Sequence, residues 1–145
     1  RLRAASDTLL RTMGNRILLL FACSLLLACN GGLDTHEGVA DAMTSNMEEM
    51  ATILEGIDSK DAADSAAGDL EKLAERVAEV NEAYNKLGNP DKEAEDALEK
   101  KYKERMMKAM QRIGTAAQKA GPYMAESQKC QEAFQRVGEK MQNMK

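Results

Sequence analysis

The sequence is poor in aromatic residues, proline and histidine. Its 145 residues include no tryptophan, two phenylalanines, three tyrosines, two prolines and one histidine. So few aromatic side chains argue against the modules that bind nucleic acids by base stacking. The formal charge of −4 also argues against binding to a phosphate backbone. A single histidine excludes most His-ligated metal enzymes and most catalytic pairs of Ser or Cys with His.

Common catalytic motifs are missing from the sequence as well. It contains no Gly-x-Ser-x-Gly motif, no phosphate-binding loop and no Glu-x-x-His pair. We therefore expect a non-enzymatic protein that needs no cofactor. With 43% apolar and 30% charged residues, the chain is long enough to bury one modest core.

A short basic segment followed by an apolar one lies near the start of the chain. Met13-Gly14-Asn15-Arg16 precedes twelve mostly apolar residues, Ile17 to Ala28. Twelve residues are too few to cross a bilayer, which takes about 20, but they suit the apolar region of a signal peptide. We expect 13–28 to be a signal peptide that starts at Met13, and 1–12 to be an upstream extension.

The end of this segment, Leu26-Leu27-Ala28-Cys29, resembles the lipobox of bacterial lipoproteins. The resemblance covers residues 13–29 and implies cleavage between Ala28 and Cys29, with diacylglycerol on the Cys29 thiol. It also implies that the new amino terminus is often acylated. More than one lipid chain holds a protein stably at a bilayer. Because Asn30 follows the cysteine, the resemblance favours the outer membrane of a bacterial envelope, facing the periplasm.

Removal of the leader would change both the cysteine content and the charge. Cys23 would leave with the leader and Cys29 would carry lipid, so Cys130 would have no partner for an intramolecular disulfide. Residues 33–87 hold 14 acidic and 4 basic residues, whereas residues 88–145 hold 9 acidic and 12 basic ones. The first half of the remaining chain is therefore strongly acidic and the second mildly basic.

After a short linker at 29–33, we expect a helical domain over 34–145. Apolar residues recur there every three or four positions, as on one face of an amphipathic helix. The pattern predicts four helices, at about 34–57, 58–87, 90–119 and beyond Pro122. The core-facing residues of the first are Val39, Met43, Met47, Met50, Leu54 and Ile57, and those of the last are Cys130, Phe134, Val137, Met141 and Met144.

Capping residues and helix breakers mark the expected boundaries. Asp34 with Glu37 forms a capping box, and Asp58 with Asp61 repeats the pattern. Gly88-Asn89-Pro90 ends the second helix and starts the third, with Asn89 as the N-cap. Gly56 weakens the end of the first helix. Gly121-Pro122 is expected to break the third helix.

These boundaries predict an all-α fold. A turn as short as 88–89 favours a tight antiparallel hairpin of the second and third helices. Four apolar faces bury one another when the helices gather, which favours an up-down antiparallel four-helix bundle made of two helical hairpins. The alternative is one long helical hairpin in which 56–61 and 121–122 are only kinks.

A ridge of basic residues follows the predicted third helix. Lys101, Arg105, Lys108 and Arg112 are spaced by four, three and four positions, and the second helix carries a matching row of glutamates at Glu71, Glu75, Glu79 and Glu82. A tight turn would bring Glu71 near Arg105 or Lys108 and Glu75 near Lys101, so the expected role is pairing that sets the helix register. The alternative is an interaction ridge for an acidic partner or lipid headgroups.

Nine methionines follow the lipobox, which is unusual for so short a chain. Met43, Met47 and Met50 share one face of the first helix, where methionine most often serves as adaptable core filler. Thioethers also select Cu(I). A copper site would combine these methionines with Cys130 or His36, although we expect Cys130 to be a buried thiol and His36 a surface residue.

The sequence therefore predicts a membrane-anchored bacterial envelope lipoprotein that acts as a helical protein-protein interaction or structural module. Its expected partners are the lipid bilayer, through Cys29, and another envelope protein or a second copy of the chain. Nucleic acid is not expected. The alternative is a periplasmic binder of Cu(I) or a cofactor, built on the methionine-rich helices.

Overall fold

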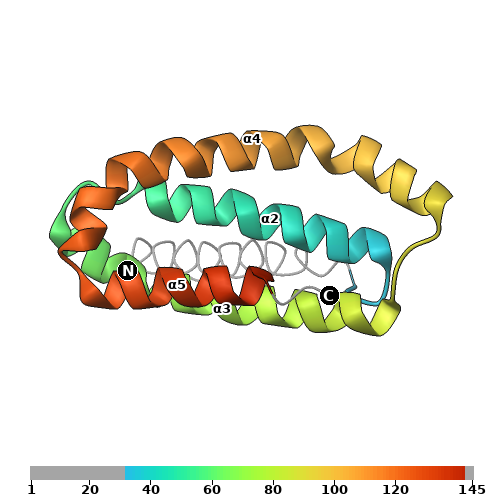
Figure 1. Ribbon diagram of the computed structural model, residues 1–145, viewed down its shortest axis with the longest axis horizontal. Coiled ribbons are helices and arrows are strands. Elements are labelled where there is room, and N and C mark those ends of the chain that lie inside the picture. Colours follow the sequence, from blue (N-terminus) through green and yellow to red (C-terminus); the bar gives the residue numbers. More distant parts are fainter. Residues whose placement is uncertain (1–31, 143–145) are drawn as a thin grey trace, which may run out of the picture. The chain divides into compact units, whose positions relative to one another are not determined.

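The computed structural model describes residues 32–142, which fold into four helices joined by short connections (Figure 1). The helices are α2 (His36–Glu55), α3 (Lys60–Leu87), α4 (Lys92–Ala125) and α5 (Gln128–Gln142). The predicted all-α four-helix bundle is confirmed, and the single long hairpin is wrong because the chain leaves helical geometry at both expected breaks. The leader, Ala28, Cys29 and Met144 lie outside the described residues.

Three helices begin with a side-chain cap, one or two residues later than predicted. The predicted caps Asp34, Asp58 and Asn89 are wrong; the caps are Thr35, Ser59 and Asp91. Each has extended backbone directly before the first helical residue, and its side-chain oxygen accepts a hydrogen bond from the N–H three residues later. The donor and acceptor are 3.0, 3.2 and 2.8 Å apart respectively.

Helix α4 continues through Gly121-Pro122, so the predicted break there is wrong. Pro122 removes one N–H donor and leaves the carbonyl of Gln118 without its helical partner. Both residues are exposed, and Pro122 lies only three positions before the helix ends at Ala125, so water can solvate that carbonyl. The actual break follows at Glu126 and Ser127.

The helices pack in an order that differs from their order along the chain. The closest backbone packing is between α2 and α4 and between α3 and α5, followed by that between α2 and α3. Helices α3 and α4 approach each other only slightly, as do α4 and α5. The predicted tight hairpin of α3 with α4 is therefore wrong. Helices α2 and α4 run in the same direction on one side, and α3 and α5 do so on the other (Figure 1).

The connection between α3 and α4 explains this arrangement. Gly88 has a φ of +72°, and Pro90 restricts Asn89 to extended backbone, so residues 88–91 stretch out instead of forming a tight turn. Four extended residues reach about 14 Å, more than the 8–10 Å between packed helix axes. The ring Nε2 of His36 lies 2.9 Å from the carbonyl oxygen of Gly88, which fixes the connection against the start of α2.

The apolar core forms where α2, α3 and α5 meet. Leu54 of α2, Leu70 and Leu73 of α3, and Cys130 and Val137 of α5 are fully buried or nearly so. A smaller cluster near the start of α2 contains Val39, Val80 and Ala83, with Leu33, Ala42, Met43, Tyr84 and Leu87 packed against it. Cys130 is buried as predicted. Among residues 32–142, no helix is both long and apolar enough to cross a membrane.

The joint between α4 and α5 is held by Ser127, which is only 1% exposed. Its hydroxyl oxygen accepts a hydrogen bond from the Cys130 N–H at 3.2 Å and caps the start of α5. The same hydroxyl donates to Asp64 of α3 at 2.6 Å. One side chain thus fixes both where α5 begins and where it lies on α3.

We predict that Ser127→Ala destabilises the fold by about 1–2 kcal/mol, because it removes a helix cap and an interhelical hydrogen bond together. Urea unfolding followed by circular dichroism measures this. The matched control is Ser65→Ala, whose exposed hydroxyl donates only to the Asp61 carbonyl one turn earlier. We expect the control to lose no more than about 0.5 kcal/mol. Equal losses in the two variants would contradict the role of Ser127.

Candidate functional site

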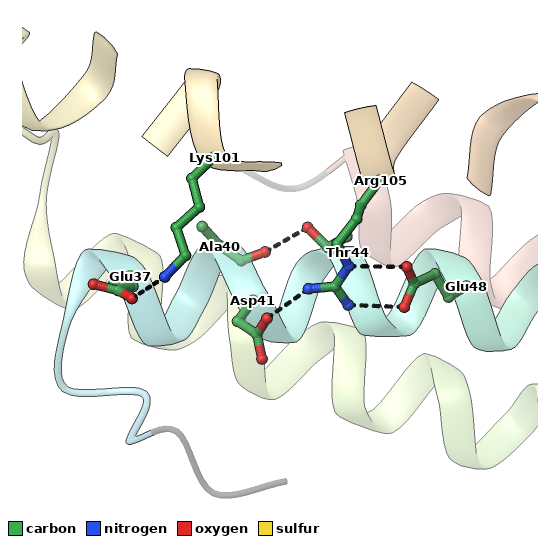
Figure 2. A network of polar contacts seen from close by, with 7 residues as sticks. All are labelled: Glu37, Ala40, Asp41, Thr44, Glu48, Lys101 and Arg105. Atoms are coloured by element: carbon green, nitrogen blue, oxygen red, sulfur yellow. Dashed lines mark hydrogen bonds and ion pairs between the residues drawn. The ribbon is translucent and has the colours of Figure 1, made fainter. Parts of the chain in front are cut away.

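A row of ion pairs joins α4 to α2 (Figure 2). Lys101 pairs with Glu37, and the Arg105 guanidinium donates to both carboxylate oxygens of Glu48, at 3.1 and 2.9 Å. A third Arg105 nitrogen donates to Asp41 at 2.9 Å. Basic and acidic residues therefore pair in the same order along both helices, which is the geometry of parallel neighbours.

The seam continues toward the other end of α4. Arg112 donates to both oxygens of Glu55, at 2.8 and 2.7 Å, and to the Thr52 hydroxyl at 3.2 Å. Lys108 contacts only Glu104 of its own helix, at 2.7 Å or less in round terms given by a 2.6 Å separation. Three of the four residues of the predicted interaction ridge therefore hold α4 against α2.

The partners expected for this ridge on α3 are wrong. Glu71 pairs with Arg136 of α5 at 3.3 Å, and α3 is too far from α4 for the predicted pairing because the 88–91 connection carries α4 to the other side of α2. The bland expectation, that the ridge sets helix register, is right in kind. It acts between α4 and α2.

Small and polar residues lie beneath the ion pairs. Thr44 is fully buried at the same helical phase as Asp41 and Glu48, and its hydroxyl donates to the Ala40 carbonyl at 2.7 Å (Figure 2). Tyr102 is buried on α4, with Lys101 Nζ 5.3 Å from its ring centroid. The α2–α4 contact is thus mostly polar, whereas the α2–α3 contact is mostly apolar.

Arg105 changes the acidity of the seam. Its hydrogen bonds, and to a smaller extent its charge, hold the pKa of Glu48 below the ordinary value of 4.5. Hydrogen bonds to Glu48 and then to Asp41 raise the pKa of Arg105 in return. Because the two side chains remain 43% and 37% exposed, solvent screens the pair. We therefore assign only about 0.5–1 kcal/mol to it.

The lowered pKa of Glu48 predicts a pH-dependent contribution to stability. A depressed carboxyl pKa stabilises the fold fully above about pH 4.5, and this contribution is lost as the pH falls through the lower folded-state pKa. Glu48→Gln should lower the free energy of unfolding by about 0.5–1 kcal/mol near neutral pH and by much less in acid. Urea unfolding at both pH values measures the difference.

The control for this experiment is Glu82→Gln, which removes an exposed carboxylate of α3 outside the α2–α4 seam. It should have little effect on the free energy of unfolding at either pH. A loss in Glu48→Gln that is the same in acid as at neutral pH would contradict an ionic role for Glu48.

An apolar cavity of about 190 Å³ lies where side chains from all four helices converge. Methionine supplies much of its wall, because Met43, Met47 and Met50 of α2 are joined there by Met141 of α5. The rest of the wall is formed by Asn46, Val77, Val80, Asn81 and Ile113. The three methionines that share a face in the sequence are therefore brought together, with a fourth from the end of the bundle.

Two asparagines in the cavity wall carry polar atoms without a partner. Asn46 is 7% exposed and Asn81 is 6% exposed. Asn81 donates through Nδ2 to the Lys140 carbonyl. Among residues 32–142, Asn46 Nδ2 and Asn81 Oδ1 are buried and make no hydrogen bond. The wall thus contains one free donor and one free acceptor, and an unpaired buried polar group is costly.

The other two residues of the hypothetical copper site lie elsewhere. His36 contacts the Gly88 carbonyl at the start of α2, and it does not line the cavity. Cys130 belongs to the core beside Ser127 and does not line the cavity either. Burial raises the pKa of the Cys130 thiol, and the nearby Asp64 charge raises it further, which makes it a poor nucleophile.

Two other methionines are exposed on α4. Met107 is 61% exposed and Met110 is 59% exposed. They lie on a face of α4 turned away from the ion-paired seam, since Arg105 and Arg112 occupy a different helical phase. Exposed large apolar side chains that cluster on one face are a common feature of interaction surfaces.

Sequence reasoning missed both the acidic face of α2 and the cavity. Acidic residues at 37, 41, 48 and 55 recur at helical spacing, and this spacing matches that of the basic ridge on α4. That match could have indicated a parallel pair of helices. No pattern in the sequence indicates that Ile113 and Met141, from different helices, meet the α2 methionines.

Comparison with known proteins adds no relative. No protein family, curated protein sequence or solved structure matches this chain. Within the part of the chain that the structure describes, no group of three or more His, Cys, Asp or Glu side chains could hold a metal ion.

Proposed function

We propose that this chain is a bacterial envelope lipoprotein, anchored in the membrane through Cys29, whose helical bundle is a non-enzymatic module for protein-protein interaction. The leader and lipobox support the anchor and its location at the outer membrane, facing the periplasm. The linker at 29–33 would keep the bundle close to the lipid surface, because five residues span at most about 17 Å.

The exposed methionine pair Met107 and Met110 is the observation that carries the interaction. Both side chains are more than half exposed on α4, and methionine adapts to differently shaped apolar partners. Lys103 and Lys108 flank the pair and are themselves exposed. This surface suits a helix with an apolar stripe and acidic edges, from another envelope protein or from a second copy of the chain.

Native mass spectrometry of the protein extracted from bacterial membranes in mild detergent tests this proposal. We expect a chain that begins at Cys29 and carries a lipid-sized mass increment, in a stoichiometric complex with a protein subunit. Met107→Glu with Met110→Glu should abolish the complex, because it places two charges in an apolar contact, and should leave the lipid increment unchanged.

A matched control carries the same two added charges at other exposed positions, Thr115→Glu and Gln142→Glu. It should retain the complex. An unmodified mass at Cys29 would refute the anchor, whereas a complex that survives in the Met107 and Met110 variant would refute the interaction surface. The two parts of the proposal can therefore fail separately.

A second candidate function is the binding of Cu(I). The observation in its favour is that Met141 joins Met43, Met47 and Met50 at one cavity, so that four thioether groups line it. His36 and Cys130 take no part in this version of the site. Thioether ligands suit a soft, singly charged ion better than the divalent metals.

The copper hypothesis predicts that the protein retains Cu(I) through dialysis against a weak chelator. Met43→Leu with Met47→Leu should abolish retention, because leucine keeps the apolar volume and removes the sulfur atoms. Met107→Leu with Met110→Leu is the matched control and should retain the ion. Copper bound equally by both double variants would exclude the cavity as the site.

A further inference from the structure

The cavity in the bundle has a wall that suits a small neutral molecule. Met50, Val77 and Val80 are buried on its inner side, whereas Met43, Met47, Ile113 and Met141 are only partly buried. The partly buried side chains are unbranched or flexible for the most part, so they can move apart to admit a ligand. The cavity is therefore both apolar inside and accessible from the surface.

The two asparagines specify the polar end of that molecule. Asn46 Nδ2 can donate one hydrogen bond and Asn81 Oδ1 can accept one. A primary or secondary amide offers the matching pair, since its carbonyl accepts and its N–H donates. A carboxylate can only accept and would bring a charge into an apolar cavity, so it suits the site less well.

The volume limits the length of the apolar part. An apolar protein cavity of roughly 150 Å³ holds one benzene, a molecule of six carbon atoms. At about 190 Å³, this cavity has room for somewhat more. We propose that the cavity is a binding site for short acyl amides, with the amide between Asn46 and Asn81 and an unbranched chain of about six carbons along the methionines. The site is independent of the membrane anchor and of the α4 surface.

The methionines themselves provide the measurement. The full chain is labelled with ¹³C at the methionine ε-methyl groups and titrated with hexanamide while methyl NMR spectra are recorded. We expect saturable shifts of the Met43, Met47, Met50 and Met141 signals. The Met107 and Met110 signals serve as internal controls and should not move, because both side chains lie outside the cavity.

Two variants narrow the cavity from different helices. Ile113→Trp fills it from α4, and Met47→Phe fills it from α2. Each should weaken hexanamide binding about tenfold or more, whereas Thr115→Trp, on an exposed position of α4, should bind as the unmodified chain does. Circular dichroism establishes that each variant is folded, and the two fillings ensure that one unfolded variant does not decide the outcome.

Replacing the ligand tests the polar end. Hexanoate at neutral pH should bind about tenfold more weakly than hexanamide, because it is charged and cannot donate to Asn81. The proposal is overturned by hexanamide shifts that do not saturate, by equal shifts at Met107 and Met110, or by unchanged binding in both folded filling variants. Equal affinity for hexanoate would overturn the assignment of an amide.

Discussion

The contact of α2 with two neighbours at once determines the rest of this bundle. On one side α2 presents Met50 and Leu54 to the apolar core that it shares with α3. On another side it presents Asp41 and Glu48 to Arg105 of α4. The apolar contact supplies most of the stabilisation, since hydrophobic burial exceeds the gain from exposed ion pairs. The ion pairs decide which helix covers the polar side and in which register.

The cavity is a consequence of this arrangement. Because α4 packs on α2 and α5 packs on α3, α2 and α5 make no close backbone approach within the described residues. Long side chains such as Met47 and Met141 have to fill the space between them, and they fill it incompletely. Methionine suits such a position because its unbranched chain adapts to irregular volumes. The same property would let the site accept a ligand.

The surfaces of the bundle divide between structure and proposed function. Basic residues that the sequence offered as an interaction ridge are engaged with the acids of α2, so they contribute to the fold. Apolar groups that remain outside, Met107 and Met110, are the better candidates for contact with another protein. A charged residue in a sequence gives no sign of whether its partner lies in the same chain, whereas an exposed apolar residue in a folded structure has already been left uncovered.

Helix count, helix class and the burial of Cys130 could be predicted because they depend on local properties. Apolar residues at helical spacing, a capping oxygen before each helix and a break near residue 56 act over a few residues. The caps were still misplaced, as at Asp34 instead of Thr35, since neighbouring polar residues compete and only backbone geometry selects one. Pro122 was overestimated because a proline near an exposed helix end loses little.

The sequence by itself determined that the described chain would form four amphipathic helices with one main core, because spacing and caps act locally. Only the tertiary structure decided that α4 lies on α2, that Glu71 meets Arg136, and that four methionines and two asparagines line one cavity. These features depend on the path of the extended 88–91 connection around the end of α2. The direction of a connection is set by the packing of every helix together, and no local pattern records it.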